Sequence, residues 1–167
     1  MSAALAMAGA LEHNEERARR EFLTCRLGAE TYGIDILKVQ EIREVKQVTR
    51  VPHVAHYVRG VINLRGAIVP VVDLGLMFGF AEPIAIEDAS AIVLNVDHRL
   101  VGLVVSSVSD VLALADDEIL PAPEIGAKRI AGAISGIGVR KGEGTAQESV
   151  LLLDVADIMK RIREERE

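Results

Sequence analysis

The chain has 167 residues, of which 50% are hydrophobic, 3% aromatic and 26% charged. A chain of this length buries about two-thirds of the surface of its unfolded form, so whole-chain disorder is excluded. Nineteen basic and 25 acidic side chains give a net charge of −6, which disfavours general attraction to nucleic-acid phosphates. The single cysteine, Cys25, excludes an internal disulfide and a multi-cysteine zinc site, and it favours a cytoplasmic location.

The first 20 residues are predicted to form a flexible or helical extension ahead of one domain at 21–167. The apolar run at 3–11 is shorter than the roughly 20 residues that span a bilayer, and no positive charges precede it as in a secretory signal. A mixed-charge stretch follows at 12–21. We therefore expect no direct membrane insertion.

From Phe22 onward, short aliphatic segments alternate with glycine and turn residues, a pattern typical of small β-barrels. Residues 22–27 and 31–36 predict a hairpin. Residues 37–42 fit either a strand or a short helix, and 53–59 predict a helical turn. Strands are expected at 60–64 and 67–74, where Pro70 is compatible only with an edge or a bulge.

The second half repeats this character after a polar break at 81–89. Residues 90–96 and 100–105 predict a hairpin around Asp97, and 108–114 extend the strand pattern. Prolines at 121 and 123 interrupt it, and the last strands flank a hairpin tip at 140–145. The chain ends in a predicted amphipathic helix, capped by Asp154, whose apolar residues recur at helical spacing: Val155, Ile158, Met159 and Ile162.

Two further patterns concern the whole chain. Residues 69–77 and 151–159 both run from an aliphatic stretch into Asp and then Met, which indicates either two related barrels or merely two strand-to-helix junctions. Residues 38–65 carry six basic and two acidic side chains, a net +4, whereas 82–124 carry nine acidic and one basic, a net −8. The division favours two different partners, with scatter over a solvated surface as the alternative.

Motifs for catalysis or cofactor binding are absent from the sequence. There is no nucleophile elbow, Walker loop or HExxH helix, and the glycines at 136–142 are one residue out of step with a dinucleotide fingerprint. His53 and His56 could share a helical face as metal ligands, but no third ligand lies nearby. Carboxylates that could pair for acid–base work all lie at strand ends, where capping or turn formation explains them: Asp73, Asp97, Asp110 and Asp154. We predict no enzymatic activity, no metal and no cofactor.

Several motifs in order resemble the CheW coupling proteins of bacterial chemotaxis, over roughly residues 22–159. The motifs are residues 32–43, 48–52, 59–73, 101–105, 108–112 and 121–124. The resemblance implies two intertwined five-stranded SH3-like β-barrels with short helices and a C-terminal amphipathic helix. It also implies a non-enzymatic adaptor that couples the cytoplasmic tip of methyl-accepting chemotaxis receptors to the regulatory domain of the histidine kinase CheA. Such a protein would be cytoplasmic and recruited to receptor arrays at the inner membrane.

The resemblance also implies two sets of site residues. The receptor would bind a hydrophobic groove between the barrels, in the helix-in-groove mode, with Glu41 and Arg65 as paired acid and base beside it. The kinase would bind at Leu120 and Ile125, where better-known relatives often carry a basic and an aromatic residue, so we expect a weaker or differently tuned contact. The expected groove residues are Val39, Glu41, Ile42, Gly60, Arg65 and Val108.

One alternative function comes from a different class. A nucleic-acid-binding module can also be built on small SH3-like barrels, and residues 38–65 are locally basic. That segment has Tyr57 as its only aromatic residue, so it lacks the stacking platforms of single-strand binders.

Overall fold

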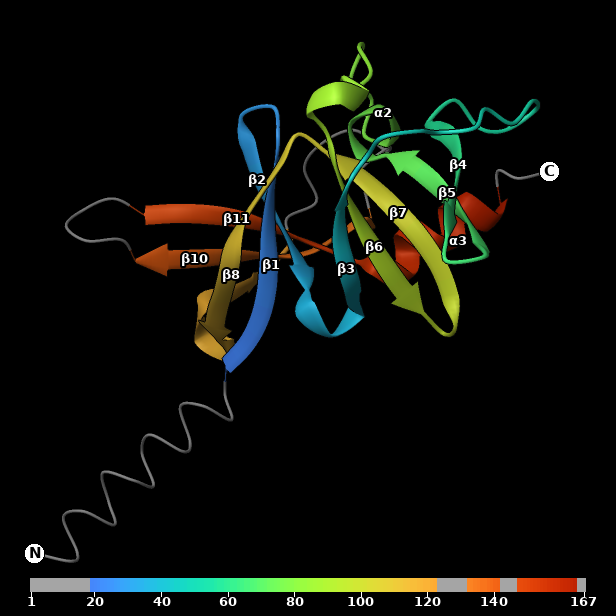
Figure 1. Cartoon of the computed structure of the whole chain (residues 1–167). Helices are drawn as coiled ribbons and strands as arrows, with labels where there is room; N and C mark the ends of the chain where they lie inside the picture. Colours follow the sequence, from blue (N-terminus) through green and yellow to red (C-terminus); the bar gives the residue numbers. More distant parts are fainter. Residues whose placement is uncertain (1–18, 123–131, 142–146, 165–167) are drawn as a thin grey trace, which may run out of the picture.

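The structure is a computed structural model that describes residues 19–122, 132–141 and 147–164 (Figure 1). Its strands are β1 Arg19–Leu27, β2 Glu30–Asp35, β3 Val39–Glu44, β4 Val58–Leu64, β5 Ala67–Asp73, β6 Ser90–Val96, β7 Arg99–Val105, β8 Ser107–Ala115, β9 Ile119–Pro121, β10 Ile134–Lys141 and β11 Gln147–Leu153. Its helices are α2 Leu74–Met77, α3 Val155–Glu164 and the single 3-10 turns η1 Ile36–Lys38, η2 Ile86–Asp88 and η3 Asp116–Glu118. The described chain is therefore mainly β, as predicted.

The strands form two sheets that lie side by side (Figure 1). The first has the order β8-β1-β2-β11-β10-β9, and the second has the order β3-β6-β7-β5-β4. Both sheets curl, because the two edge strands of each sheet are linked by a short connection. In the first sheet, η3 alone separates the edge strands β8 and β9. In the second sheet, the segment that follows the edge strand β3 pairs with the edge strand β4 through Thr49 and Val61. The first sheet has a sixth strand, β9, that was not predicted.

The two sheets are built by exchange of strands between two similar halves of the chain. Each half starts with a hairpin, β1–β2 or β6–β7, then crosses to the other sheet with β3 or β8. There it adds a second hairpin, β4–β5 or β10–β11, and ends in a helix, α2 or α3. The order β3-β6-β7-β5-β4 thus matches β8-β1-β2-β11-β10 strand for strand, which explains why the two sheets are intertwined.

The match between the halves extends to single residues. The second hairpin of each half is held to its sheet by a parallel pairing, Val71 with Gly102 and Leu152 with Gly33. Each also carries a bulge that ends at a glycine, Gly60 in β4 and Gly136 in β10. Both helices begin with an aspartate whose carboxylate accepts the amide hydrogen three residues on: Asp73 from Leu76 and Asp154 from Asp157. The echo between residues 69–77 and 151–159 therefore reflects two related structural units.

The core has one shared part and one part private to each sheet. Alternate side chains of β1, β2, β6 and β7 meet between the sheets, where α3 also contributes Val155 and Ile158. The opposite faces enclose a smaller cluster around Phe22 and Leu112 in the first sheet, and two clusters around Val71 and Val93 in the second. Since strand side chains alternate between faces, the aliphatic runs of the sequence bury both faces of each sheet.

Most local predictions are confirmed and a few are wrong. Residues 37–42 divide between η1 and β3, and Pro70 lies in β5 immediately before its pairing with β7 begins, so it is locally at an edge. The predicted helical turn at 53–59 is wrong. That segment holds one hydrogen-bonded turn, closed by the Val58 amide and the Ala55 carbonyl, and then enters β4. Residues 1–18 of the predicted extension lie outside the described residues, whereas its last two residues, Arg19 and Arg20, belong to β1.

Candidate functional site

An open groove of about 1000 Å³ runs between β3 and β4, the two edge strands of the second sheet. We call it the seam groove. Its walls are residues 41–47 and Thr49 on one side and Val61, Ile62, Asn63 and Arg65 on the other, and its floor is Val71 and Ala91. Among the described residues, no ladder joins β3 to β4, so the backbone edges face the groove.

The related first sheet shows why this groove is open. In the first sheet, the pair Phe22 and Leu112 fills the equivalent place, and these side chains are only 3% and 5% exposed. The strand register puts Ala91 and Arg43 at the same two positions of the second sheet. A methyl group replaces a phenyl ring, and a charged side chain replaces an apolar one, so the space is not filled.

Glu41 and Arg65 form an ion pair and hydrogen bond across the seam groove, from β3 to the end of β4. Arg43 lies on the other side of the same carboxylate, with its Nε 3.8 Å from Glu41 Oε1. The hydrogen bond and the charge of Glu41 raise the pKa of Arg65 above its ordinary value. Because the Arg65 side chain is 66% exposed, the pair is a surface contact that adds little to folding stability.

The backbone places Arg65 in an unusual conformation. It is the first residue of the two-residue turn between β4 and β5, with φ of +50° followed by +91° at Gly66. Such turns favour Asn, Asp or Gly at both positions, as at Asp97 in the β6–β7 turn. The Asn63 side chain accepts the Gly66 amide hydrogen and stabilises the turn. An arginine here is unfavourable for the turn, which points to a role in recognition.

The structure does not bring all the predicted groove residues together. Glu41, Ile42 and Arg65 line the seam groove, and Ile42 is 49% exposed. Val39 and Val108 lie at equivalent positions of the two crossing strands, half-buried against the shared core, and neither lines the seam groove. The groove that holds the acid–base pair is therefore within the second sheet, whereas we expected it between the two barrels.

Gly60 has a structural role in this geometry. It is buried at the β4 bulge with φ of +144°, and a Cβ atom there would lie 2.1 Å from the carbonyl oxygen of Thr49. The close approach permits the two hydrogen bonds between Thr49 and Val61 that fasten the segment after β3 to β4. Gly60 thus allows Thr49, which lines the seam groove, to lie against β4.

Of the two predicted kinase-contact residues, Leu120 lies on the first sheet. Leu120 is in β9 and 49% exposed, next to the acidic turn η3. Ile125 lies outside the described residues. An exposed leucine on a short edge strand is the type of side chain that anchors a protein contact, and this position stays a prediction.

The groups considered for chemistry have structural partners. The buried Asp73 carboxylate accepts hydrogen bonds from the Leu76 and Ile84 amides and from Arg59 at 3.2 Å. Asp110 pairs with the Thr24 hydroxyl at 2.8 Å. Burial of Cys25 raises the pKa of its thiol to about 12. Within the described ranges, no three His, Cys, Asp or Glu side chains gather as a metal site.

Sequence reasoning missed Arg43 and Ala91, which create the seam groove. The signal was present in the sequence but needed an alignment of one half of the chain on the other. Once β1 is matched to β6 and β8 to β3, the change from Phe22 to Ala91 and from Leu112 to Arg43 is visible.

The comparisons with known proteins agree with one another. The model of the CheW-like domain family matches residues 21–163. A chemotaxis protein CheW of Klebsiella aerogenes is 42% identical over 86% of this chain and 84% of its own length, and one of Treponema pallidum is 30% identical over 84% and 80%. The crystal structure of the scaffolding protein TtCheW from Thermoanaerobacter tengcongensis superposes with a TM-score of 0.71 at 27% identity, covering 81% of this chain and 88% of that one.

No described helix is both long enough and apolar enough to cross a bilayer. Taken together, the strand-exchanged double sheet, the motifs across residues 32–124 and these matches show that the chain belongs to the CheW family of chemotaxis proteins.

Proposed function

We propose that this chain is a non-enzymatic adaptor that couples methyl-accepting chemotaxis receptors to the histidine kinase CheA, in the cytoplasm at receptor arrays. The observation that carries the proposal is the seam groove with the Glu41–Arg65 pair across it, on a chain of the CheW family. The relatives are named as chemotaxis proteins, and TtCheW is named as a scaffolding protein. A scaffold needs separate surfaces for separate partners.

The seam groove suits an amphipathic helix of the receptor tip. Its floor is aliphatic, Val61 and Ile62 are partly exposed on its wall, and charged side chains surround it, so a helix could bury an apolar stripe there while its flanks meet the charges. The volume of about 1000 Å³ accommodates several side chains. Val39 and Val108 extend the proposed contact along the crossing strands.

The kinase contact is proposed at Leu120, in β9 of the first sheet, and at Ile125. The turn η3 just before Leu120 is acidic, whereas β3, β4 and the segment between them carry a net positive charge. An adaptor transmits a signal only if the alternative states of the receptor differ in their contact energy with it. The shared core, which links both sheets in one packed unit, provides a stiff connection between the two contacts.

No observation on the described surface favours the nucleic-acid alternative. The basic segment is aromatic-poor, and every reported relative carries a chemotaxis name.

Charge exchange across the seam groove tests the receptor contact. Arg65→Glu should weaken binding to a receptor cytoplasmic fragment, and the additional change Glu41→Arg should restore part of the binding. The restoration is partial because Arg43 would lie beside the arginine introduced at position 41. Arg26→Glu, an exposed charge reversal on β1, is the matched control and should bind normally. Equal losses in the single and double variants at pH 7 would contradict a role for the pair.

A further inference from the structure

A cleft of about 170 Å³ lies between α3 and the second sheet. We call it the helix cleft. Its lining comes from β5, the first residues of β7 and the second half of α3: Ile68, Pro70, Arg99, Leu100, Val101, Met159, Ile162 and Arg163. The equivalent helix α2 has four residues against ten in α3, so the cleft results from the greater length of α3.

The helix cleft exposes aliphatic side chains that the fold does not require there. Ile68 on β5 is 64% exposed, and Leu100 on β7 is half-buried. The strand registers place Ser149 and Thr31 at the equivalent positions of the first sheet. Since polar residues serve at these positions in one sheet, the apolar pair in the other sheet is surface available for a contact.

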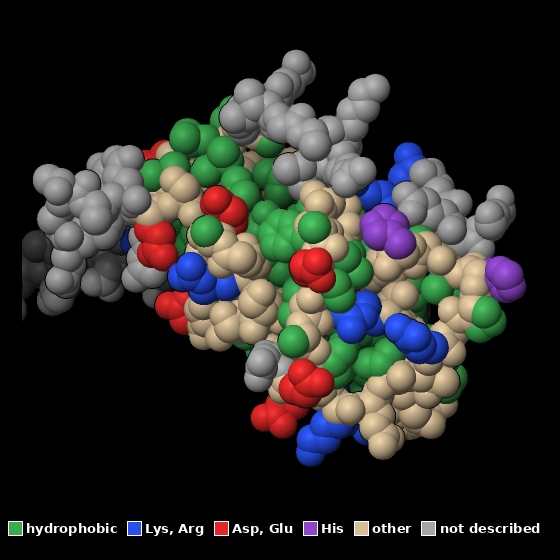
Figure 2. All heavy atoms as spheres, turned by 90° about the horizontal axis from the view of Figure 1, so that it is seen from above, with side chains coloured by type: hydrophobic (Ala, Val, Ile, Leu, Met, Phe, Trp, Pro, Cys, Tyr) green, Lys and Arg blue, Asp and Glu red, His purple; other side chains and the backbone are tan. Residues whose placement is uncertain are grey.

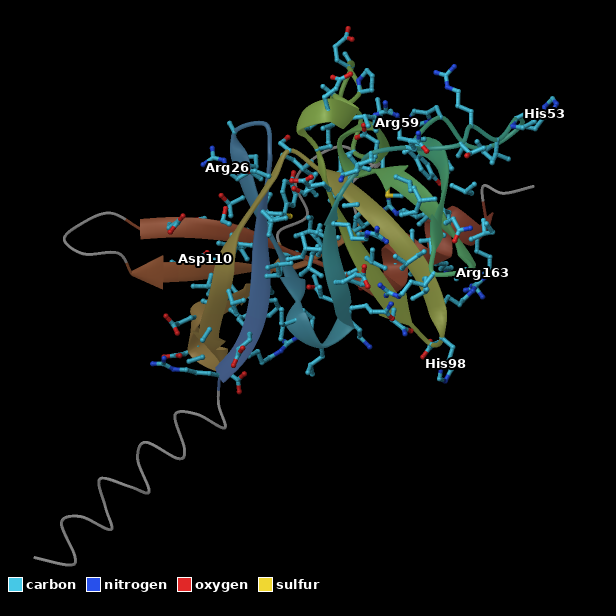
Figure 3. The ribbon with its side chains drawn as sticks, viewed as in Figure 1. Arg26, His53, Arg59, His98, Asp110 and Arg163 are labelled. Carbon is cyan, nitrogen blue, oxygen red and sulfur yellow. The ribbon has the colours of Figure 1, made fainter. Side chains whose placement is uncertain are left out.

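Two arginines flank this apolar surface, Arg99 at the start of β7 and Arg163 near the end of α3. Both are exposed, and no ion pair is recorded for either of them among the described residues. Figure 3 shows Arg163 on the same side of the molecule as His98, the residue before Arg99.

The charge of the helix cleft is unbalanced. None of its described lining residues is acidic, and Asp97, two residues before Arg99, lies in the β6–β7 turn outside the lining. By contrast, acidic and basic side chains are interspersed on the face of the molecule that Figure 2 shows from above. An occupant of the cleft would therefore meet aliphatic side chains and two positive charges.

The 18 residues that precede β1 match this combination in composition and in length. Residues 3–11 contain only Ala, Leu, Met and Gly, and Glu12, Glu15 and Glu16 follow them. Eighteen extended residues span up to about 60 Å, whereas a compact domain of this size is about 40 Å across. Figure 1 shows the start of β1 and the β6–β7 turn at the same, lower end of the molecule, so Arg99 lies within reach of the segment.

We infer that residues 3–16 of this chain bind the helix cleft, with aliphatic side chains inside it and glutamates beside Arg99 and Arg163. Charge complementarity between the acidic segment and the two arginines favours this occupant. Because the segment is tethered, its effective concentration at the cleft is on the order of millimolar, so weak contacts suffice. The seam groove is a poorer site, since its lining includes Glu41 and Glu44, which repel the glutamates.

The bound segment would lie close to the seam groove without entering it. It would cover Ile68, which pairs directly with Asn63 across the β4–β5 ladder, and Asn63 lines the seam groove. The inference thus adds an internal contact next to the proposed receptor site, but it does not rest on receptor binding.

A nitroxide spin label on the variant Ala4→Cys of the full-length, 15N-labelled protein tests the contact by NMR. Cys25 is buried and the pKa of its thiol is raised to about 12, so the label attaches at position 4 alone. The amide signals of Ile68, Leu100 and Ile162 should be broadened by the nitroxide and should recover when the nitroxide is reduced.

Charge reversal and mixing complete the test. Arg99→Glu combined with Arg163→Glu should reduce the broadening severalfold, because two attractions become repulsions, whereas the exposed control Arg26→Glu should leave it unchanged. The inference is overturned if the broadening is absent, if the double reversal does not affect it, or if it is centred on Ile42 in the seam groove. Broadening in a mixture of spin-labelled protein without 15N and 15N-labelled protein without the spin label would assign the contact to a second copy and equally overturn the inference.

Discussion

The seam groove can be filled with the side chains that the protein itself uses in the related sheet. The double variant Ala91→Phe, Arg43→Leu copies the Phe22 and Leu112 pair, which is 3% and 5% exposed in the first sheet. Burial of each side chain contributes about 1.5–3 kcal/mol. Loss of the contact between Arg43 and Glu41 costs about 0–1 kcal/mol, and imperfect packing costs about 1–3 kcal/mol. The balance is a stabilisation of about 2 kcal/mol, which raises the Tm of a domain of this size by about 4–8 °C.

The same variant should lose affinity for the receptor fragment, because the space for a helix is occupied. Thermal unfolding and binding are measured on one preparation, with Arg26→Glu as the control. A raised Tm with unchanged receptor binding would refute the seam groove as the receptor site. A lowered Tm would instead refute the equivalence of the two sheets, since the copied side chains would then not fit.

Three further predictions concern single positions. Gly60→Ala should lower the free energy of unfolding, measured in urea, by about 2–5 kcal/mol, because its Cβ atom would clash with the Thr49 carbonyl at a positive φ. Gly66→Ala, where a Cβ atom would have no atom within 4 Å, should cost about 1 kcal/mol. Similar costs for the two variants would contradict the close approach of Gly60 to Thr49. Burial raises the pKa of the Cys25 thiol to about 12 in the folded state, so the free energy of unfolding should fall by up to about 4 kcal/mol as the pH increases from 9 to 12. Cys25→Ala should lack this decline. A native thiol that reacts rapidly with Ellman's reagent at pH 8 would refute its burial. Leu120→Asp should weaken binding of the CheA regulatory domain severalfold without lowering Tm, since this side chain is half exposed, and unaltered tight binding would remove Leu120 from the kinase contact.

Local structure was predictable wherever neighbouring residues determine it. Asp97 and His98 adopt the positive φ values that the predicted turn requires, and Asp154 caps α3 as expected. The turn at Arg65 was also found, although its strained first residue was not recognised as a signal. These features depend on residues within one turn or one hairpin, so a single sequence contains the information.

The arrangement of the strands was beyond reach without the resemblance to a known family. The exchange of β3–β5 and β8–β11 between sheets depends on pairing between residues that are far apart in the chain, such as Thr24 with Asp110. The strand β9 is three residues long, and it lies so close to β10 that a Cβ atom at Gly136 would be 2.8 Å from the Leu120 carbonyl oxygen. The position of the seam groove depends on the small side chain of Ala91, which does not fill the space that Phe22 fills in the first sheet. A small residue at one strand position gives the sequence no local pattern that predicts a groove.

The central claim is that this chain physically connects a receptor to CheA, and reconstitution tests it most directly. A receptor cytoplasmic fragment, CheA and this protein are combined at fixed concentrations, and phosphorylation of CheA is followed with and without each component. We predict that the receptor fragment changes the phosphorylation rate only when this protein is present, and that Arg65→Glu reduces the change. A rate that is the same with and without the protein would contradict the adaptor role.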